Sequence, residues 1–149
     1  MLRKLQRLSK LSAGELLVFW QLFLLAVIAR ISLLFIALPR VTAFVVWGAN
    51  QPFLRCLPLF HGHYQMTQLT CLADLAARGT RADGPCLIRS LLLFGLLKVR
   101  GEQAELLIGV RKDGPVFNSH AWIESDGKIL GENGDGTLPF APLLRFSHG

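Results

Sequence analysis

Apolar residues follow helical spacing through the first half of the chain. The first such stretch runs from Leu16 to Leu38 and is interrupted only by Gln21, Arg30 and Ser32. A second apolar region, residues 41–60, contains two prolines. Stretches of this length and composition indicate helices rather than strands.

Two further helices are expected before the pattern changes. Residues Gln65–Arg78 repeat apolar positions every three or four residues, and Gly79 follows as a stop. Residues Leu87–Lys98 present a broad apolar face and end near Gly101, with cations in the last turn.

Beyond Gly101 the residues favour strands. Glu105–Val110 and Val116–Glu124 read as two strands separated by a turn-rich break at Arg111–Pro115. A turn at Ser125–Gly127 then leads into a third strand, Lys128–Glu132. We therefore predict an α+β fold, in which a helical N-terminal region precedes a helix packed on a short antiparallel sheet.

Cys86 and His120 are the residues best suited to catalysis. Cys86 follows Asp83, which can cap a helix, and Gly84-Pro85, which can begin one. The N–H groups of a helix start stabilise a thiolate, and an imidazole on a strand can serve as its base. The alternative is structural: Cys86 is then a small buried hydrophobe and His120 a core histidine bonded to a carbonyl.

The register of the hairpin after His120 decides which residue can orient its ring. A two-residue loop at Asp126-Gly127 places Asn133 opposite His120. A three-residue loop with a left-handed glycine places Glu132 there instead. Either side chain can accept a hydrogen bond from an imidazole N–H, so both stay open.

The composition bounds the class of protein. A chain of 149 residues supports one domain, and 52% hydrophobic against 17% charged residues makes it more apolar than most soluble domains. Its net charge of +6 suits an acidic partner or an anionic membrane surface. Nucleic acid is not an expected partner, because the basic residues are scattered and form no binding motif.

The N-terminal apolar stretch raises the question of a membrane. Leu16–Leu38 is long enough to span a bilayer, although Arg30 near its middle costs about 2.5–3.5 kcal/mol on insertion scales. Four early cations suit docking on an anionic inner leaflet: Arg3, Lys4, Arg7 and Lys10. We favour a packed or surface-docked helix over a span, because the second half of the chain needs more core than it carries. The expected location is the cytoplasm, with membrane association through this segment.

The cysteines give no framework of their own. Three of them, Cys56, Cys71 and Cys86, argue against a disulfide scaffold. A metal site built from Cys56, His61, His63 and Cys71 does not match the spacing of a compact zinc module. We therefore expect neither a metal nor a cofactor.

The order of several short segments resembles a known family. It is similar to the stand-alone leader peptidase of lasso peptide biosynthesis, a transglutaminase-like cysteine protease of the papain-like superfamily. The resemblance covers about residues 70 to 140 and depends on Cys86–Leu91, Arg100-Gly101, Leu107–Arg111, and His120–Glu124 followed by Asp126-Gly127.

The resemblance implies a catalytic triad. Cys86 matches the nucleophile and His120 the base. Glu132 stands where the family usually has Asp, about a dozen residues after the histidine, so its longer side chain is a departure. The backbone N–H of Cys86 is the expected oxyanion donor, with Gln65 and Gln68 as candidate side-chain donors.

The resemblance also implies a biological role and partners. The enzyme would cut the leader from a ribosomally made precursor peptide before a separate lasso cyclase closes the macrolactam, aided by a separate leader-binding protein. Residues 1–60 would form a helical region for docking a partner or membrane, and residues 61–149 the protease core, in one folded unit. Two rival interpretations are an acyltransferase on the same fold and a non-catalytic hydrophobic interaction or membrane protein.

Overall fold

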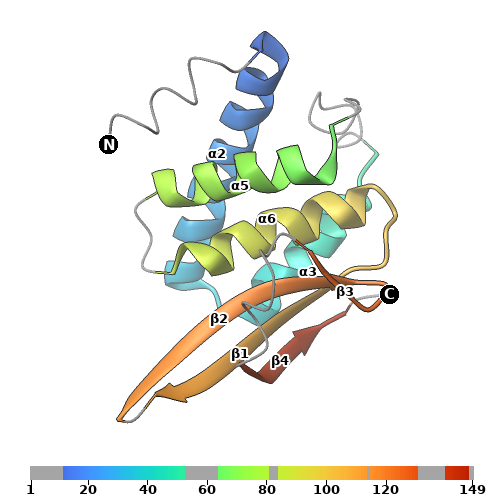
Figure 1. The fold of residues 1–149 in the computed structure, drawn as a ribbon. Coiled ribbons are helices and arrows are strands. Elements are labelled where there is room, and N and C mark those ends of the chain that lie inside the picture. The colour runs from blue at the N-terminus through green and yellow to red at the C-terminus, as the bar shows by residue number, and fades with distance from the viewer. Residues whose placement is uncertain (1–11, 53–63, 81–83, 114, 131–139, 148–149) are drawn as a thin grey trace.

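Four helices precede a four-stranded antiparallel sheet in the part of the chain that the structure describes (Figure 1). The structure is a computed structural model, and it describes residues 12–52, 64–80, 84–113, 115–130 and 140–147. The helices are α2 (Ala13–Phe35), α3 (Leu38–Ala49), α5 (Met66–Gly79) and α6 (Pro85–Val99). The strands are β1 (Glu105–Asp113), β2 (Val116–Ser125), β3 (Lys128–Leu130) and β4 (Ala141–Phe146). The predicted α+β class is confirmed.

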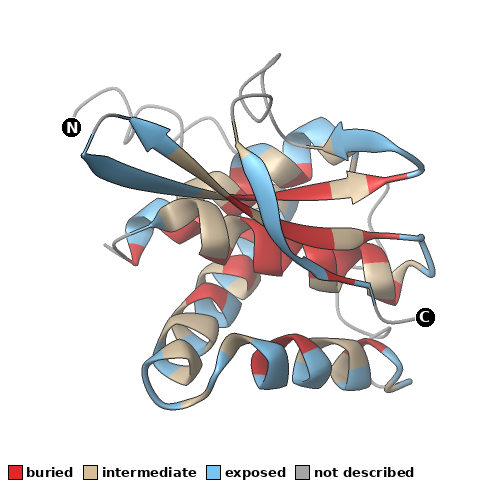
Figure 2. Cartoon of the chain, turned by 90° about the horizontal axis from the view of Figure 1, so that it is seen from below, coloured by how far each residue is buried: buried red, intermediate tan, exposed pale blue. Residues whose placement is uncertain are grey.

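The sheet has the order β3-β2-β1-β4, and β1 pairs with β2 along its whole length. The hairpin that they form projects beyond the helices (Figure 1), and its far end is exposed while its near end is buried (Figure 2). The predicted break at Arg111–Pro115 is wrong in its first half, because β1 continues to Asp113. The last residues of β1 are polar because the projecting end of the hairpin faces solvent on both sides.

Helix α6 occupies the centre of the molecule, between α5 and the sheet (Figure 1). It is apolar and buried almost all round, as expected for a helix covered on every side. Its buried residues are Ile88, Ser90, Leu91, Leu92, Leu93, Phe94, Leu96, Leu97 and Val99. All of these except Ser90 and Val99 join side chains of α2, α5, β1 and β2 in one hydrophobic core.

The long N-terminal apolar stretch, Leu16–Leu38, forms one helix, α2, and only its last residue, Leu38, belongs to the next helix, α3. Helix α2 begins at a capping box, in which the Ser12 hydroxyl accepts from the Glu15 N–H and the Glu15 carboxylate accepts from the Ser12 N–H. It ends where Ile36 turns extended, and Pro39 in the first turn of α3 fits a new helix start rather than a helix interior.

Helix α2 meets the rest of the protein along one face. Its buried residues are Val18, Phe19, Leu22 and Ala26, which pack into the core. Arg30, near the C-terminal end of that face, donates a hydrogen bond to the carbonyl of Thr80 at the end of α5. By length and composition alone α2 could cross a membrane, with a mean hydropathy of 2.2 over an 18-residue window, 22% of which is buried.

Strand β4 was not predicted from the sequence. It pairs with the outer side of β1, with Phe146 opposite Leu106, and its register shifts between Ile108 and Gly109. Pro142 lies opposite Gly109 at that irregularity. Proline is tolerated there because β4 ends the strand order, where one side of a strand has no ladder partner to lose.

Candidate active site

Cys86 is the second residue of α6 and is partly buried. The helix starts at Pro85, and its N-cap is Gly84, which has φ 96° and ψ 61°. That left-handed conformation is available to glycine without strain. The N-cap position is therefore taken by Gly84, and Asp83, for which we predicted a capping role, lies outside the described residues. The thiol of Cys86 is free and sits where the first N–H groups of a helix are unpaired by the helix itself.

Ser90 holds the first turns of α6 on β2. It is 1% exposed, and its hydroxyl donates a hydrogen bond of 2.9 Å to the carbonyl of Ala121. Cys86 precedes Ser90 by one helical turn, so the two side chains share a helix face. Ala121 directly follows His120 in β2. One hydrogen bond therefore brings the start of α6 to the strand that carries His120.

The direction of the two elements fixes where Cys86 lies along that strand. Helix α6 and β2 run broadly the same way (Figure 1). One helical turn advances about 5.4 Å and two strand residues about 6.6 Å. Going back from the contact between Ser90 and Ala121, Cys86 comes level with the residues just before Ala121. His120 is among them.

The ring of His120 lies in an aromatic environment. Its centroid is 6.3 Å from that of Trp122, nearly parallel at 16°, and 5.3 Å from that of Phe140. Because neighbouring strand residues alternate in direction, His120 and Trp122 take the sheet face opposite to Ala121, which meets α6. The imidazole therefore lies outside the fully buried layer between helix and sheet, and it is partly buried.

The Ser90–Ala121 bond brings the start of α6 to the backbone of β2, but the imidazole of His120 takes the face of β2 that is turned away from α6. The structure therefore brings the two elements together without placing the His120 ring against the Cys86 thiol. The roles of nucleophile and base stay predictions.

Gly109 makes room for the aromatic residue beside the histidine. It faces His120 across the β1–β2 ladder, and a Cβ on Gly109 would come within 2.7 Å of the Trp122 ring and 2.9 Å of the Ala141 carbonyl. Trp122 in turn donates from Nε1 to Glu124 Oε1 at 3.0 Å. The indole is thereby held over β1, with its ring nearly parallel to that of His120.

The structure shows the length of the loop between β2 and β3, which sets the register of their pairing. Ser125 pairs with Lys128, so the loop contains two residues, Asp126 and Gly127. Both have positive φ, 49° and 72°, as a type I′ hairpin turn requires. The three-residue alternative is wrong.

Glu132 and Asn133 themselves lie outside the described residues, in the range 131–139. If the pairing of β2 with β3 continued in the same register, Asn133 would stand opposite His120. The identity of the third member stays a prediction. Gln65 and Gln68 begin α5, where the Gln65 N–H donates to Gln68 Oε1 at 3.1 Å. That bond uses Gln68 as a helix cap.

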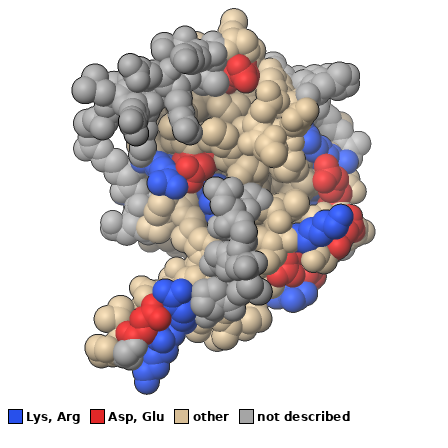
Figure 3. Space-filling model, in the orientation of Figure 1, with Lys and Arg blue, Asp and Glu red and all other residues tan. Residues whose placement is uncertain are grey.

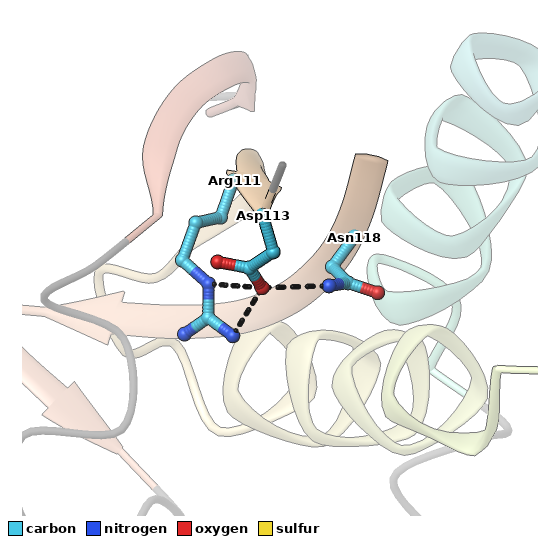
Figure 4. A network of polar contacts seen from close by, with 3 residues as sticks. All are labelled: Arg111, Asp113 and Asn118. Atoms are coloured by element: carbon cyan, nitrogen blue, oxygen red, sulfur yellow. Dashed lines mark hydrogen bonds and ion pairs between the residues drawn. The ribbon is translucent and has the colours of Figure 1, made fainter. Parts of the chain in front are cut away.

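Arg111, Asp113 and Asn118 form a polar cluster on the β1–β2 hairpin (Figure 4). Asp113 Oδ2 accepts from Arg111 Nε and Nη2 at 2.9 and 2.7 Å, and from Asn118 Nδ2 at 2.8 Å. These bonds, those from Arg111 first, hold the pKa of Asp113 below its ordinary value. The Arg111 guanidinium also lies 5.0 Å above the ring of Phe140, which contacts His120. Figure 3 shows charges of both signs on this projecting end. Arg111 entered the sequence analysis only as the last residue of the Leu107–Arg111 segment, and Phe140 was not singled out, because it meets His120 from 20 residues further along the chain.

The described residues hold no group of three or more potential metal ligands. Cys71 lies exposed on α5. Cys56, His61 and His63 lie outside the described residues.

Comparison with known families adds to this geometry. A family model described as the transglutaminase-like superfamily matches residues 60–145, more than half of the chain. The chain belongs to the transglutaminase-like superfamily. No curated protein and no solved structure matches. This superfamily consists generally of cysteine proteases and transglutaminases, so membership indicates a cysteine-protease or acyltransferase type of function.

The part of this transglutaminase-like chain that matches the family spans α5, α6, β1, β2, β3 and nearly all of β4. It includes Cys86 and His120. Helices α2 and α3 precede the matched range, and both pack against α6.

Proposed function

We propose that this protein is a cysteine peptidase that removes the leader from a ribosomally made lasso peptide precursor, before a separate cyclase closes the macrolactam. Membership of the transglutaminase-like superfamily supports the class of chemistry. The observation that carries the proposal is the hydrogen bond from Ser90 to Ala121, which draws the helix start bearing Cys86 to the strand bearing His120. The order of motifs from Cys86 to Glu124 supports the choice of substrate by resemblance.

The chemistry follows from the two residue types. His120 takes the proton of the Cys86 thiol, and the thiolate attacks the carbonyl of the scissile amide. The N–H of Cys86 donates to the oxyanion of the tetrahedral intermediate. His120 then protonates the leaving amine, and a thioester forms between Cys86 and the leader. Water, deprotonated by His120, attacks the thioester, and leader and thiol are released.

A third residue would hold the imidazole in the productive tautomer. Glu132 is our choice from the resemblance, and Asn133 is the alternative that the two-residue turn favours. Substituting each with alanine separates them: the variant that loses most of the cleavage rate identifies the residue, and two silent variants would leave a Cys–His dyad.

The substrate would be delivered by a separate leader-binding protein, since one small domain offers little surface for selecting a leader. Linking enzyme and precursor in this way raises the effective substrate concentration. The reaction would take place in the cytoplasm, where a ribosomally made precursor is available.

The testing experiment incubates the purified chain with a precursor peptide, with and without the leader-binding protein and a primary amine. Mass spectrometry of the products then distinguishes the functions. Free leader with an unmodified carboxylate supports the peptidase. Leader joined to the amine in preference to water would replace it with an acyltransferase, and uncleaved precursor under all conditions would contradict both.

A further inference from the structure

The outer surface of α2 is apolar along its whole length. One stripe of residues, recurring every three or four positions, is between 48% and 84% exposed: Leu17, Trp20, Leu24, Ile28, Ile31 and Phe35. It lies on the side of α2 opposite to its buried residues. Such a stripe is far larger than the scattered apolar residues that soluble surfaces normally carry.

Helix α3 extends this surface. Phe44 and Trp47 are each 62% exposed, and Arg40 lies on the same face, one helical turn before Phe44. A groove of about 460 Å³ runs between α2, α3 and α6. Its lining includes Leu25, Ile28 and Phe44, which also belong to the exposed apolar residues. Ile28 of the α2 stripe and Phe44 of α3 both line this groove, and we call the exposed apolar residues of the two helices together the outer face.

Positive charge is concentrated in the same part of the chain. Residues 1–52 contain six Lys and Arg against one acidic residue, Glu15, whereas residues 53–149 contain ten against nine. Five of the six net charges therefore belong to the segment that carries the outer face. Residues 16–52 contain no acidic residue at all.

An exposed apolar surface together with an excess of cations favours one kind of binding partner for the outer face. A protein partner would be fixed by hydrogen-bonding groups of both kinds around an apolar centre. The charged groups of residues 16–52 are all cationic, and two exposed tryptophans stand among aliphatic residues, which is the composition of an interfacial membrane surface. Four further cations precede α2 in the sequence, within residues 1–11, and would add attraction to anionic headgroups.

We infer that the outer face lies on the surface of an anionic phospholipid bilayer, with α2 and α3 immersed to the level of the acyl chains. A span by α2 is disfavoured, because Val18, Phe19, Leu22 and Ala26 are committed to the protein core and Arg30 is bonded to Thr80. This inference goes beyond the proposed peptidase and does not depend on it.

The test is co-sedimentation of the full chain with vesicles of phosphatidylcholine, alone or with about 30% phosphatidylglycerol. The chain is expected to bind the anionic vesicles, to bind the zwitterionic ones weakly, and to lose binding at high salt. Trp47→Glu and Phe35→Glu should each lower the partition coefficient by about tenfold, because each places a carboxylate in the interface. Phe117→Glu is the matched control: Phe117 is 70% exposed on the projecting hairpin, and its variant should bind like wild type. Cys86→Ala should also bind like wild type, which separates this test from that of the peptidase.

Several results would overturn the inference. They are failure of the wild-type chain to bind anionic vesicles, equal binding by Trp47→Glu and wild type, and loss of binding by Phe117→Glu. Resistance of membrane-bound chain to alkaline carbonate would show that α2 spans the bilayer instead. A dimer that Trp47→Glu dissociates, without vesicle binding, would assign the outer face to a second copy.

Discussion

Helices α6 and α2 are both strongly apolar, yet they have opposite surroundings. Helix α6 is covered by the sheet, α2, α3 and α5, and nine of its 15 residues are buried. Helix α2 has four buried residues among 23, and its other side exposes large apolar residues to solvent. The apolar residues of α6 are explained by the core, and those of the outer face are not. This difference is consistent with the two separate functions that we propose, catalysis at the start of α6 and docking along α2.

The largest expected effect is on catalysis, at the proposed active site beside the start of α6. His120→Ala removes the base, so kcat/KM for precursor cleavage should fall by at least about 100-fold, since general-base terms supply about 10²–10⁴. The partly buried position of His120 means that the fold should persist, which circular dichroism can verify. A loss below tenfold would show that His120 is structural. The start of α6 would then have no catalytic function to set against docking by α2.

The two helices should differ sharply in their contribution to stability. Phe94 is fully buried in α6, and Phe94→Ala should lower the free energy of unfolding by about 3–5 kcal/mol. Leu24 is 61% exposed on α2, and Leu24→Ala should change it by no more than about 0.5 kcal/mol. Urea denaturation measures both. Similar losses for the two variants would mean that the outer face is covered in solution.

Ser90 should affect stability and rate together. Ser90→Ala leaves the Ala121 carbonyl without its side-chain donor, and should lower the free energy of unfolding by about 1–2 kcal/mol. It should also lower kcat/KM, because α6 is no longer fixed on β2. Thr70→Ala is the control, since the Thr70 hydroxyl bonds within α5 to the Met66 carbonyl. If Ser90→Ala and Thr70→Ala changed kcat/KM equally, Ser90 would have no role in positioning α6.

The smallest effect concerns the hairpin and depends on pH. Folding lowers the pKa of Asp113 through its bonds with Arg111 and Asn118, so its stabilising effect is present at neutral pH and is lost as pH falls through the folded-state pKa. Asp113→Asn should therefore lower Tm by no more than about 2 °C at pH 7, and by nothing measurable near pH 2. A larger difference near pH 2 than at pH 7 would contradict this sign.

The sequence was informative wherever local chemistry decides structure. It located α6 and its stop at Gly101, which has φ 75°. It also reduced the hairpin after β2 to two registers, one of which the structure has. The end of α2 was missed because the apolar pattern continues through Ile36, while the break depends on the start of a new helix at Leu38, with Pro39 in its first turn.

Long-range features escaped prediction for a common physical reason. Strand β4 contains Pro142, which argues against a strand, and its place is set by pairing with β1 far away in the chain. The bond from Ser90 to Ala121 joins residues that no local pattern connects. The exposure of the outer face was also hidden, because an apolar stretch predicts a helix without specifying which side is covered.

The most direct test of the peptidase compares wild type with Cys86→Ala on a precursor peptide, supplied with its leader-binding protein and followed by mass spectrometry. Cys71→Ser is the matched control, since Cys71 is an exposed cysteine on α5, outside the proposed site. We expect wild type and Cys71→Ser to release leader and core, and Cys86→Ala to release neither while keeping its fold. Cleavage by Cys86→Ala at the wild-type rate would contradict the central claim that this thiol is the nucleophile.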